Sequence, residues 1–274
     1  MTSLERVGRP AVWAEPPAAI RFFRDAWTIA EGELRKLRHD PTELLTRAVQ
    51  PLLWLLVFGQ VMAQTRAIST GNLGYEDFLA PGILAQSALF SAIFFGIAVI
   101  WERDLGVLHK YLVSPAARSA LVTGKALAGG LRALVQAAMV YAVALVIGVH
   151  LRLDPLSLIG VALVVVTGSA AFATFSLVIA CLVRTRERFM GIGQVLTMPL
   201  FFASSAIYPI SLMPDWLKVV AQVNPLTYQV DALRGLMIQG ATESFPLALD
   251  FAVLIGSTVI LIAIAARLYP RLAQ

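Results

Sequence analysis

Charged residues are scarce in this sequence. Only 14% of its 274 residues are Asp, Glu, Lys or Arg, whereas a soluble domain carries about 25%. Hydrophobic residues make up 58% of the chain, and its mean hydropathy is +0.75. The two values together exclude a soluble enzyme and indicate a chain whose solvent is lipid.

Residues that commonly carry chemistry are also few. The single cysteine, Cys181, excludes an internal disulfide and a cysteine-based metal cage. The three histidines, His39, His109 and His150, all fall in loops or at interfaces, where a solvated surface role is expected. The apolar runs contain no Ser/His, paired-Asp or His-Glu-x-x-His arrangement for hydrolysis inside a membrane. We therefore expect no catalytic residue, no metal site and no enzyme activity.

Energy sources within the chain are missing as well. Carriers coupled to protons or sodium usually place ionisable groups at mid-membrane, and none is forced there by this sequence. The run around Gly124-Lys125 is the nearest approach to a phosphate loop, but it lacks the first glycine and the Ser/Thr after the lysine. The chain is expected to bind no cofactor of its own, so ATP and Mg would belong to a partner.

Long apolar runs predict the fold class. A helix needs about 20 apolar residues to cross a bilayer, and the sequence has six suitable stretches. The expected class is all-α, a polytopic membrane protein with six transmembrane helices. The stretches are Thr46–Met62, Phe78–Trp101, Ala133–Val149, Leu156–Val183, Phe189–Tyr208 and Pro246–Ala266.

An amphipathic helix is predicted before the first span. After Pro16-Pro17, apolar residues recur at intervals of three and four, and basic residues occupy the other face. Such a helix is expected to lie in the membrane interface, and a helix of a small soluble cap is the alternative. The apolar positions are Ile20, Phe23, Trp27, Ala30, Leu34 and Leu37. Residues 1–43 are then a cytoplasmic N-terminus, and residues 44–274 form the transmembrane domain.

The basic residues predict the orientation. Of the 22 Lys and Arg residues, 18 lie on the side of the N-terminus if six spans are present, and four lie opposite, namely Arg66, Arg152, Lys218 and Arg234. Positive residues favour the cytoplasmic side, so both termini are expected in the cytoplasm. The net charge of +5 is then explained by the membrane and its lipids, and no nucleic-acid partner is expected.

Two connecting segments have a pattern of their own. In Glu102–Pro115, the residues Leu105, Leu108 and Leu112 form an apolar stripe, which fits either a lipid surface or a groove in a partner. The connection from Tyr208 to Phe245 is too apolar for a free loop and is interrupted by three prolines. Two short helices dipping into the outer leaflet are expected there, and a surface helical hairpin is the alternative.

These segments carry a family resemblance. Asn224-Pro225-Leu226-Thr227-Tyr228, followed by Arg234, resembles the signature of the type-2 permease family of ATP-binding-cassette (ABC) transporters. The run from Glu102-Arg103-Asp104-Leu105-Gly106 through Ser114-Pro115 to Gly124-Lys125 resembles the "E-x-x-x-G … SP … GK" segment of that family. The overall pattern is most similar to small exporter permeases for antibiotics and nodulation-type lipo-oligosaccharides.

The resemblance implies a set of partners. The chain would be half of a transmembrane unit, paired with a second copy or a sister permease, above two cassette ATPases. Residues 102–118 would be the coupling segment that docks into the ATPase, and residues 208–247 the outer re-entrant segment. The expected ATPase contacts are Glu102, Arg103, Leu105, Gly106, Leu108, Leu112, Ser114 and Pro115.

It also implies a path and a gate. Pro225, Tyr228 and Arg234 would shape the outer gate, although a structural arginine bonded to helix-end carbonyls is an equal alternative for Arg234. Aromatic residues in the spans are candidates for a path taken by an amphipathic drug, lipid or glycolipid across the bacterial plasma membrane, namely Phe90, Phe94, Phe201 and Phe202. The alternative function is an energy-independent scaffold or channel that recruits a cytoplasmic partner through residues 102–115.

Overall fold

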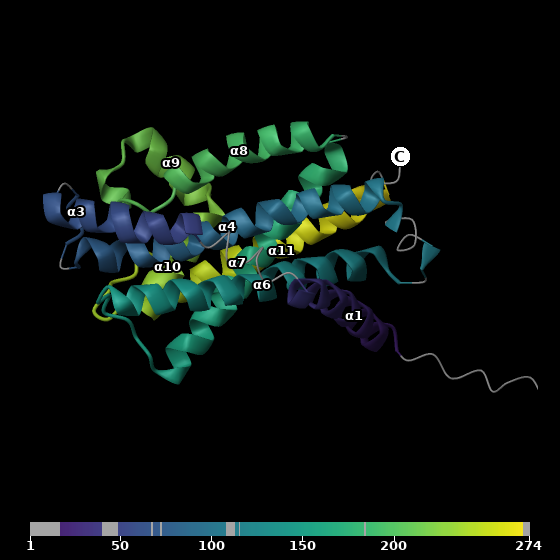
Figure 1. Ribbon diagram of the computed structural model, residues 1–274, viewed down its shortest axis with the longest axis horizontal. Coiled ribbons are helices and arrows are strands. Elements are labelled where there is room, and N and C mark those ends of the chain that lie inside the picture. Colours follow the sequence, from purple (N-terminus) through teal and green to yellow (C-terminus); the bar gives the residue numbers. More distant parts are fainter. Residues whose placement is uncertain are drawn as a thin grey trace, which may run out of the picture.

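The structure, a computed structural model, describes residues 17–39, 49–66, 68–71, 73–107, 113–114, 116–183 and 185–270. Helices and short connections make up this part of the chain, and it contains no strand beyond a single bridge between Leu151 and Ile238. Figure 1 shows the elements along the long axis of the molecule. They are α1 (Ala18–His39), η1 (Trp54–Gly59), α3 (Gln60–Thr65), α4 (Tyr75–Asp104), α6 (Arg118–Val146), α7 (Pro155–Leu182), α8 (Arg186–Phe202), η2 (Ile210–Leu212), α9 (Asp215–Val223), α10 (Pro225–Met237) and α11 (Leu247–Leu268).

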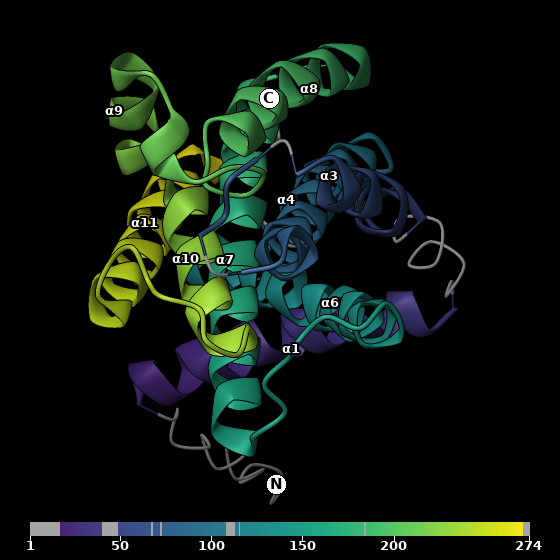
Figure 2. The ribbon, with the colours of Figure 1, turned by 90° about the vertical axis from the view of Figure 1, so that its left-hand side faces the viewer.

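Four of these helices, α4, α6, α7 and α11, are long and apolar enough to cross a membrane. Helix α7 lies among them and packs against α4, α6, α10 and α11, as the view along the long axis shows (Figure 2). Its buried positions are mainly Ala, Gly, Ser and Val, and such small residues let membrane helices approach closely. The expected all-α polytopic membrane fold is therefore confirmed.

The first and fifth predicted spans are shorter helices. Residues 49–65 are helical throughout, with the π-helical turn η1 three residues after Pro51, and α8 has 17 residues. A helix of this length reaches about 25 Å, slightly less than the roughly 30 Å of a hydrocarbon core. The count of six spans therefore stays a prediction. Helix α8 lies along the outside of the bundle (Figure 1) and exposes apolar side chains such as Met190, Val195 and Met198.

The predicted amphipathic helix is present as α1. It lies across the bundle at the end away from α9, and it packs against α6 (Figures 1 and 2). Contact between these two helices requires Gly124, because a Cβ atom there would lie 2.5 Å from the carbonyl oxygen of Ala26. Ala26 and Ala30 are buried by this contact, whereas Phe23 and Trp27 remain exposed. The exposed apolar face is available to lipid, and its location at the membrane surface stays a prediction.

The predicted helical hairpin is formed by α9 and α10. The two helices differ in environment. Most side chains of α10 are buried against α4, α7 and α11. Helix α9 instead exposes the apolar side chains of Trp216, Val219 and Val223. The two-helix prediction is therefore confirmed, whereas insertion of the hairpin into a leaflet stays a prediction.

Candidate functional site

The predicted coupling segment begins where α4 ends. Gly106, with a φ of +71°, follows the end of the helix in the left-handed conformation that glycine tolerates best. Leu105 and Gly106 are exposed at this point, and Leu105 is 71% exposed. Of the other expected ATPase contacts, Ser114 is half-buried, and Leu108, Leu112 and Pro115 lie outside the described residues. Docking of this segment into a partner stays a prediction.

Three buried charges and one half-buried charge lie next to that segment. Lys125 on α6 is 1% exposed, and its Nζ lies 2.6 Å from Oε2 of Glu102 on α4 and 3.2 Å from Oε1 of Glu33 on α1. Arg132, about two turns further along α6, donates to Oε2 and to the backbone carbonyl of the same Glu33, both at 3.1 Å. Both cations also lie within 5.7 Å of the centre of the Phe95 ring. Two positive and two negative charges are therefore paired with one another in a site that is largely shielded from solvent.

This buried ion cluster, formed by Glu33, Glu102, Lys125 and Arg132, joins three elements. Glu33 anchors α1, Glu102 anchors the last turn of α4, and both cations belong to α6. Buried charges are stable only when they are paired, so a displacement of the α4 end changes the environment of the whole cluster. The cluster can therefore link the position of the coupling segment to α1 and α6.

Sequence reasoning did not find this cluster. It gave Glu102 and Arg103 as contacts of the ATPase, whereas the structure shows Glu102 buried against Lys125 of its own chain. One signal was available. Glu33 lies seven positions after Ala26 and three after Ala30, so it shares the buried face of α1, where an acidic residue needs a partner.

A second set of contacts links the ends of α4 and α8. Arg103 lies 3.1 Å from Oδ1 of Asp104, and Arg186 at the start of α8 donates to Oδ2 at 2.7 Å. The guanidinium of Arg186 also stacks over the Trp101 ring, 3.5 Å from its centre. The α8 helix is thereby attached to the same end of α4 that carries the coupling segment.

At the opposite end, the signature residues attach α10 to α8. Asn224 caps α10, since its Oδ1 accepts a hydrogen bond from the Leu226 amide at 3.0 Å, and Pro225 occupies the first helical position. The side-chain amide of Asn224 donates to the carbonyl of Leu200 at 2.7 Å and to that of Ala203 at 3.3 Å. Asn224 and Pro225 therefore begin α10, and Asn224 also binds carbonyl groups at the C-terminal end of α8.

Tyr228 holds the hairpin and the following loop together. Its hydroxyl donates to the carbonyl of Gln222 at 2.6 Å, and its ring lies 5.0 Å from that of Phe245. The same loop is fixed by Asp231, a residue that the sequence analysis missed, whose carboxylate accepts from the amides of Ser244 and Phe245. Tyr228 and Asp231 therefore both hold the loop of residues 239–246 against α10.

Arg234 is buried and makes carbonyl contacts. Its guanidinium lies over the Phe78 ring, 3.9 Å from the ring centre, and Nη2 donates to the carbonyl of Ser205 at 2.6 Å. Ser205 lies in the turn that follows α8. These contacts fit the structural alternative for Arg234, and a part in an outer gate stays a prediction. The three gate residues predicted from the sequence thus lie together at one end of the bundle.

The adjacent connection between α6 and α7 is polar. The carboxylate of Asp77 accepts from the backbone amide of His150 at 2.9 Å and lies 3.1 Å from its Nδ1, while the ring remains largely exposed. Asp154 caps α7 through the amide of Ser157 at 2.9 Å, and this bond holds the pKa of Asp154 below its usual value. These contacts stabilise the connection, and they leave His150 the surface role that was expected for it.

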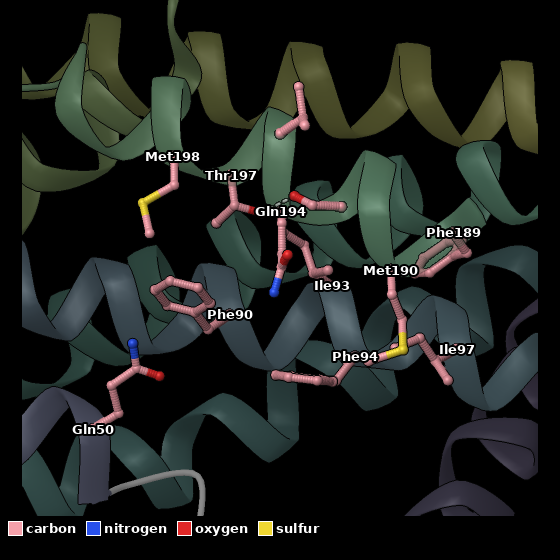
Figure 3. Close-up of a pocket in the computed structure, with 12 residues that line it drawn as sticks. Gln50, Phe90, Ile93, Phe94, Ile97, Phe189, Met190, Gln194, Thr197 and Met198 are labelled. Carbon is pink, nitrogen blue, oxygen red and sulfur yellow. Dashed lines mark hydrogen bonds between the residues drawn. The ribbon is translucent and has the colours of Figure 1, made fainter. Parts of the chain in front are cut away.

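An apolar hollow of about 590 Å³ lies between α4 and α8, beside the start of the helical residues 49–65. In Figure 3, Phe90, Ile93 and Phe94 of α4 face Met190, Gln194 and Met198 of α8 across this space. Charged residues are absent from its described lining. The lining residues are Gln50, Phe90, Ile93, Phe94, Ile97, Phe189, Met190, Gly193, Gln194, Val195, Thr197 and Met198.

The four predicted path residues divide into two pairs. Phe90 and Phe94 line the hollow, whereas Phe201 and Phe202 are not among its lining residues. Phe201 is buried and packs edge-on against Trp54 and Phe202. Its role is therefore to pack the end of α8 against η1. The sequence could not separate this role from that of Phe90, because both are aromatic residues within an apolar run.

Known proteins resemble this chain over most of its length. Residues 24–238 match the family described as ABC-2 type transporter. A transport permease of Cyanophora paradoxa, ycf38, is 28% identical over 250 residues, covering 89% of this chain and 85% of the relative. The daunorubicin resistance ABC transporter permease protein DrrB1 of Streptomyces coeruleorubidus is 24% identical, covering 93% and 89%. Nodulation protein J of Rhizobium leguminosarum bv. trifolii is 25% identical, covering 71% and 74%. With its bundle of apolar helices and its match to more than three quarters of the chain, this protein belongs to the ABC-2 type transporter family, whose members are permease components of ABC transporters.

Proposed function

We propose that the chain is the transmembrane permease subunit of an ATP-driven exporter in the bacterial plasma membrane. Its cargo is an amphipathic drug, lipid or glycolipid, and a separate nucleotide-binding subunit supplies the energy. The observation that carries this proposal is the hollow between α4 and α8, whose lining is mainly apolar and has no charged side chain among the described residues. Its size falls within the ~300–1,000 Å³ of typical small-molecule pockets. The relatives named for daunorubicin resistance and nodulation support the same class of cargo.

In this proposal, the end of the bundle with α1 faces the cytoplasm. Both termini and residues 102–118 then lie on the side of the cassette ATPases, of which two serve one complex and bind ATP and Mg. The buried ion cluster transmits movement of the coupling segment to α1 and α6, because Glu102 is both the start of that segment and a partner of Lys125. An ATPase can bias the path only through an element that it contacts differently in its two states.

A second permease subunit, either another copy or a sister chain, would cover α8. This helix packs mainly on α4 and leaves large apolar side chains exposed, Val195 at 71% among them. Covering α8 would also enclose the hollow and turn it into a path. At the other end, the hairpin held by Pro225, Tyr228 and Arg234 would close that path toward the outside, since its α10 packs directly on α4 and α7.

Transport by the purified complex in inside-out vesicles tests this function. The assay measures ATP-dependent uptake of daunorubicin and of a fluorescent lipid. Phe94→Ala is expected to reduce uptake of both by enlarging the hollow and removing contact area. Phe202→Ala is the matched control, because Phe202 is similarly exposed but lies outside the hollow. Uptake that is unchanged by Phe94→Ala would refute the assigned path, and recruitment of a partner without ATP-dependent uptake would favour the scaffold.

A further inference from the structure

A second, smaller hollow of about 190 Å³ adjoins the apolar one. The two share Gln50, Phe90 and Phe94 in their linings, so they are neighbouring parts of one space. The smaller hollow differs in chemistry. Beyond the shared residues it is lined by Pro51, Ser87, Ser91 and Gln136. It therefore offers hydroxyl and amide groups next to an aromatic and aliphatic wall.

Gln136 is a buried polar residue in the lining of this smaller, polar hollow. The residue lies midway along α6 and is 2% exposed. Its Oε1 is buried and accepts no hydrogen bond from any group in the described part of the chain. A buried amide oxygen without a donor is unfavourable, and it becomes favourable when a ligand that enters the hollow brings one. Oε1 of Gln136 can therefore accept a hydrogen bond from a ligand.

The lack of charged residues in the two linings restricts the ligand further. Among the described residues, neither lining contains Asp, Glu, Lys, Arg or His. An ionised head group would lose its hydration there without gaining a counter-charge, which is strongly unfavourable in a low-dielectric site. A hydroxyl or amide head group loses less, because Gln136 Oε1 can replace one of its hydrogen bonds to water.

We propose that the polar hollow is a head-group subsite of the cargo path. It takes an amphiphile whose apolar body lies between α4 and α8 and whose uncharged head donates a hydrogen bond to Oε1 of Gln136. The subsite rests on the proposed function, since it assigns to the path a preference among amphiphiles. Phe90 and Phe94, which border both hollows, mark the boundary between body and head. The flexible side chains of Met190 and Met198 adapt to bodies of different shape.

Photolabelling with a matched pair of probes tests the subsite. The purified complex in phosphatidylcholine nanodiscs is labelled with a diazirine-bearing dodecyl alcohol and with its methyl ether, and modified residues are identified by mass spectrometry. The two probes have the same body, and only the alcohol can donate. One net hydrogen bond corresponds to roughly a two- to tenfold preference. The alcohol is therefore expected to label the lining of the apolar hollow two- to tenfold more efficiently than the ether.

Two substitutions separate the subsite from general effects. Gln136→Leu removes the acceptor at nearly constant size and should abolish the preference for the alcohol while labelling by the ether persists. Gln86→Leu is the control, because Gln86 is also 2% exposed with an Oε1 that lacks a partner in the described chain, yet it lines neither hollow. This control should keep the preference. Gln136→Met serves the same purpose if the leucine variant does not fold.

The outcomes are distinguishable. Equal labelling by the two probes in the unmodified protein, or a preference that survives Gln136→Leu, would overturn the subsite and leave the path between α4 and α8 intact. Failure of both probes to label residues of the apolar hollow would overturn the proposed path as well.

Discussion

Replacing Lys125 with methionine is expected to weaken the junction between α4, α1 and α6. The substitution retains most of the side-chain volume and removes the positive charge that lies 2.6 Å from Glu102 and 3.2 Å from Glu33. Glu33 keeps Arg132 at 3.1 Å, and Glu102 loses the shorter of the two Lys125 contacts. Removing one partner of a buried ion pair costs about 3–5 kcal/mol. We expect a loss of unfolding free energy in this range.

A double-mutant cycle identifies the source of the loss. Glu102→Gln combined with Lys125→Met removes both charges of the closest pair, so the double variant should be more stable than the sum of the two single effects predicts. Residues in one buried network show coupling energies of about 0.5–3 kcal/mol. For the same reason Glu102→Lys, which places a second positive charge beside Lys125, should be the most damaging single change, and Lys125→Glu should partly rescue it.

The assay has two readouts. Denaturant titration of the chain in detergent measures the free energies of unfolding. Stimulation of ATPase activity by cargo in the assembled complex measures the coupling between the permease and the ATPase. We expect that stimulation falls in Lys125→Met and recovers in part when Glu102→Lys is combined with Lys125→Glu. A loss below about 1 kcal/mol for Lys125→Met, typical of an exposed ion pair, or a cycle with zero coupling energy would refute the reasoning.

Three further results are expected. Gly124→Ala forces a Cβ atom to within 2.5 Å of the α1 backbone and should lower the free energy of unfolding by about 1–3 kcal/mol through overpacking. Its control is Gly256→Ala on α11, which faces open space and should be neutral or stabilising in the same unfolding measurement. Arg234→Met leaves a buried carbonyl without its donor and should cost about 1–3 kcal/mol; a variant as stable as the parent would contradict the structural role of the guanidinium. In a cysteine-free background, a cysteine at the exposed Ser69 should react with an impermeant thiol reagent from outside the cell and one at Glu187 should not, and reversed labelling would overturn the orientation.

The spans were predictable because long apolar runs are a local signal. The predicted stretch Leu156–Val183 agrees with α7 (Pro155–Leu182) to one residue at each end. The predicted Phe78–Trp101 lies within α4 (Tyr75–Asp104), and the helix extends beyond it at both ends into polar residues that hydropathy does not count. Element type thus followed from composition, whereas element ends depended on capping and tertiary contacts.

The contacts that organise the candidate sites were not predictable in the same way. Glu33 meets Lys125 across 92 positions of sequence, and Arg234 meets Ser205 across 29. No local periodicity encodes such pairings. The family signature pointed to Arg234 without its partners, and it did not point to Glu33 at all. An unpaired charge on a buried helix face indicates that a partner exists, but only the three-dimensional arrangement identifies it.

The central claim is that this chain works as a permease with a separate ATPase. Tagged chain purified from native membranes in mild detergent, with every co-purifying protein identified, tests it most directly. We expect recovery of an ATP-binding-cassette ATPase, together with either untagged copies of this chain or a sister permease. Recovery of the chain without any nucleotide-binding partner, at several detergent strengths, would contradict it.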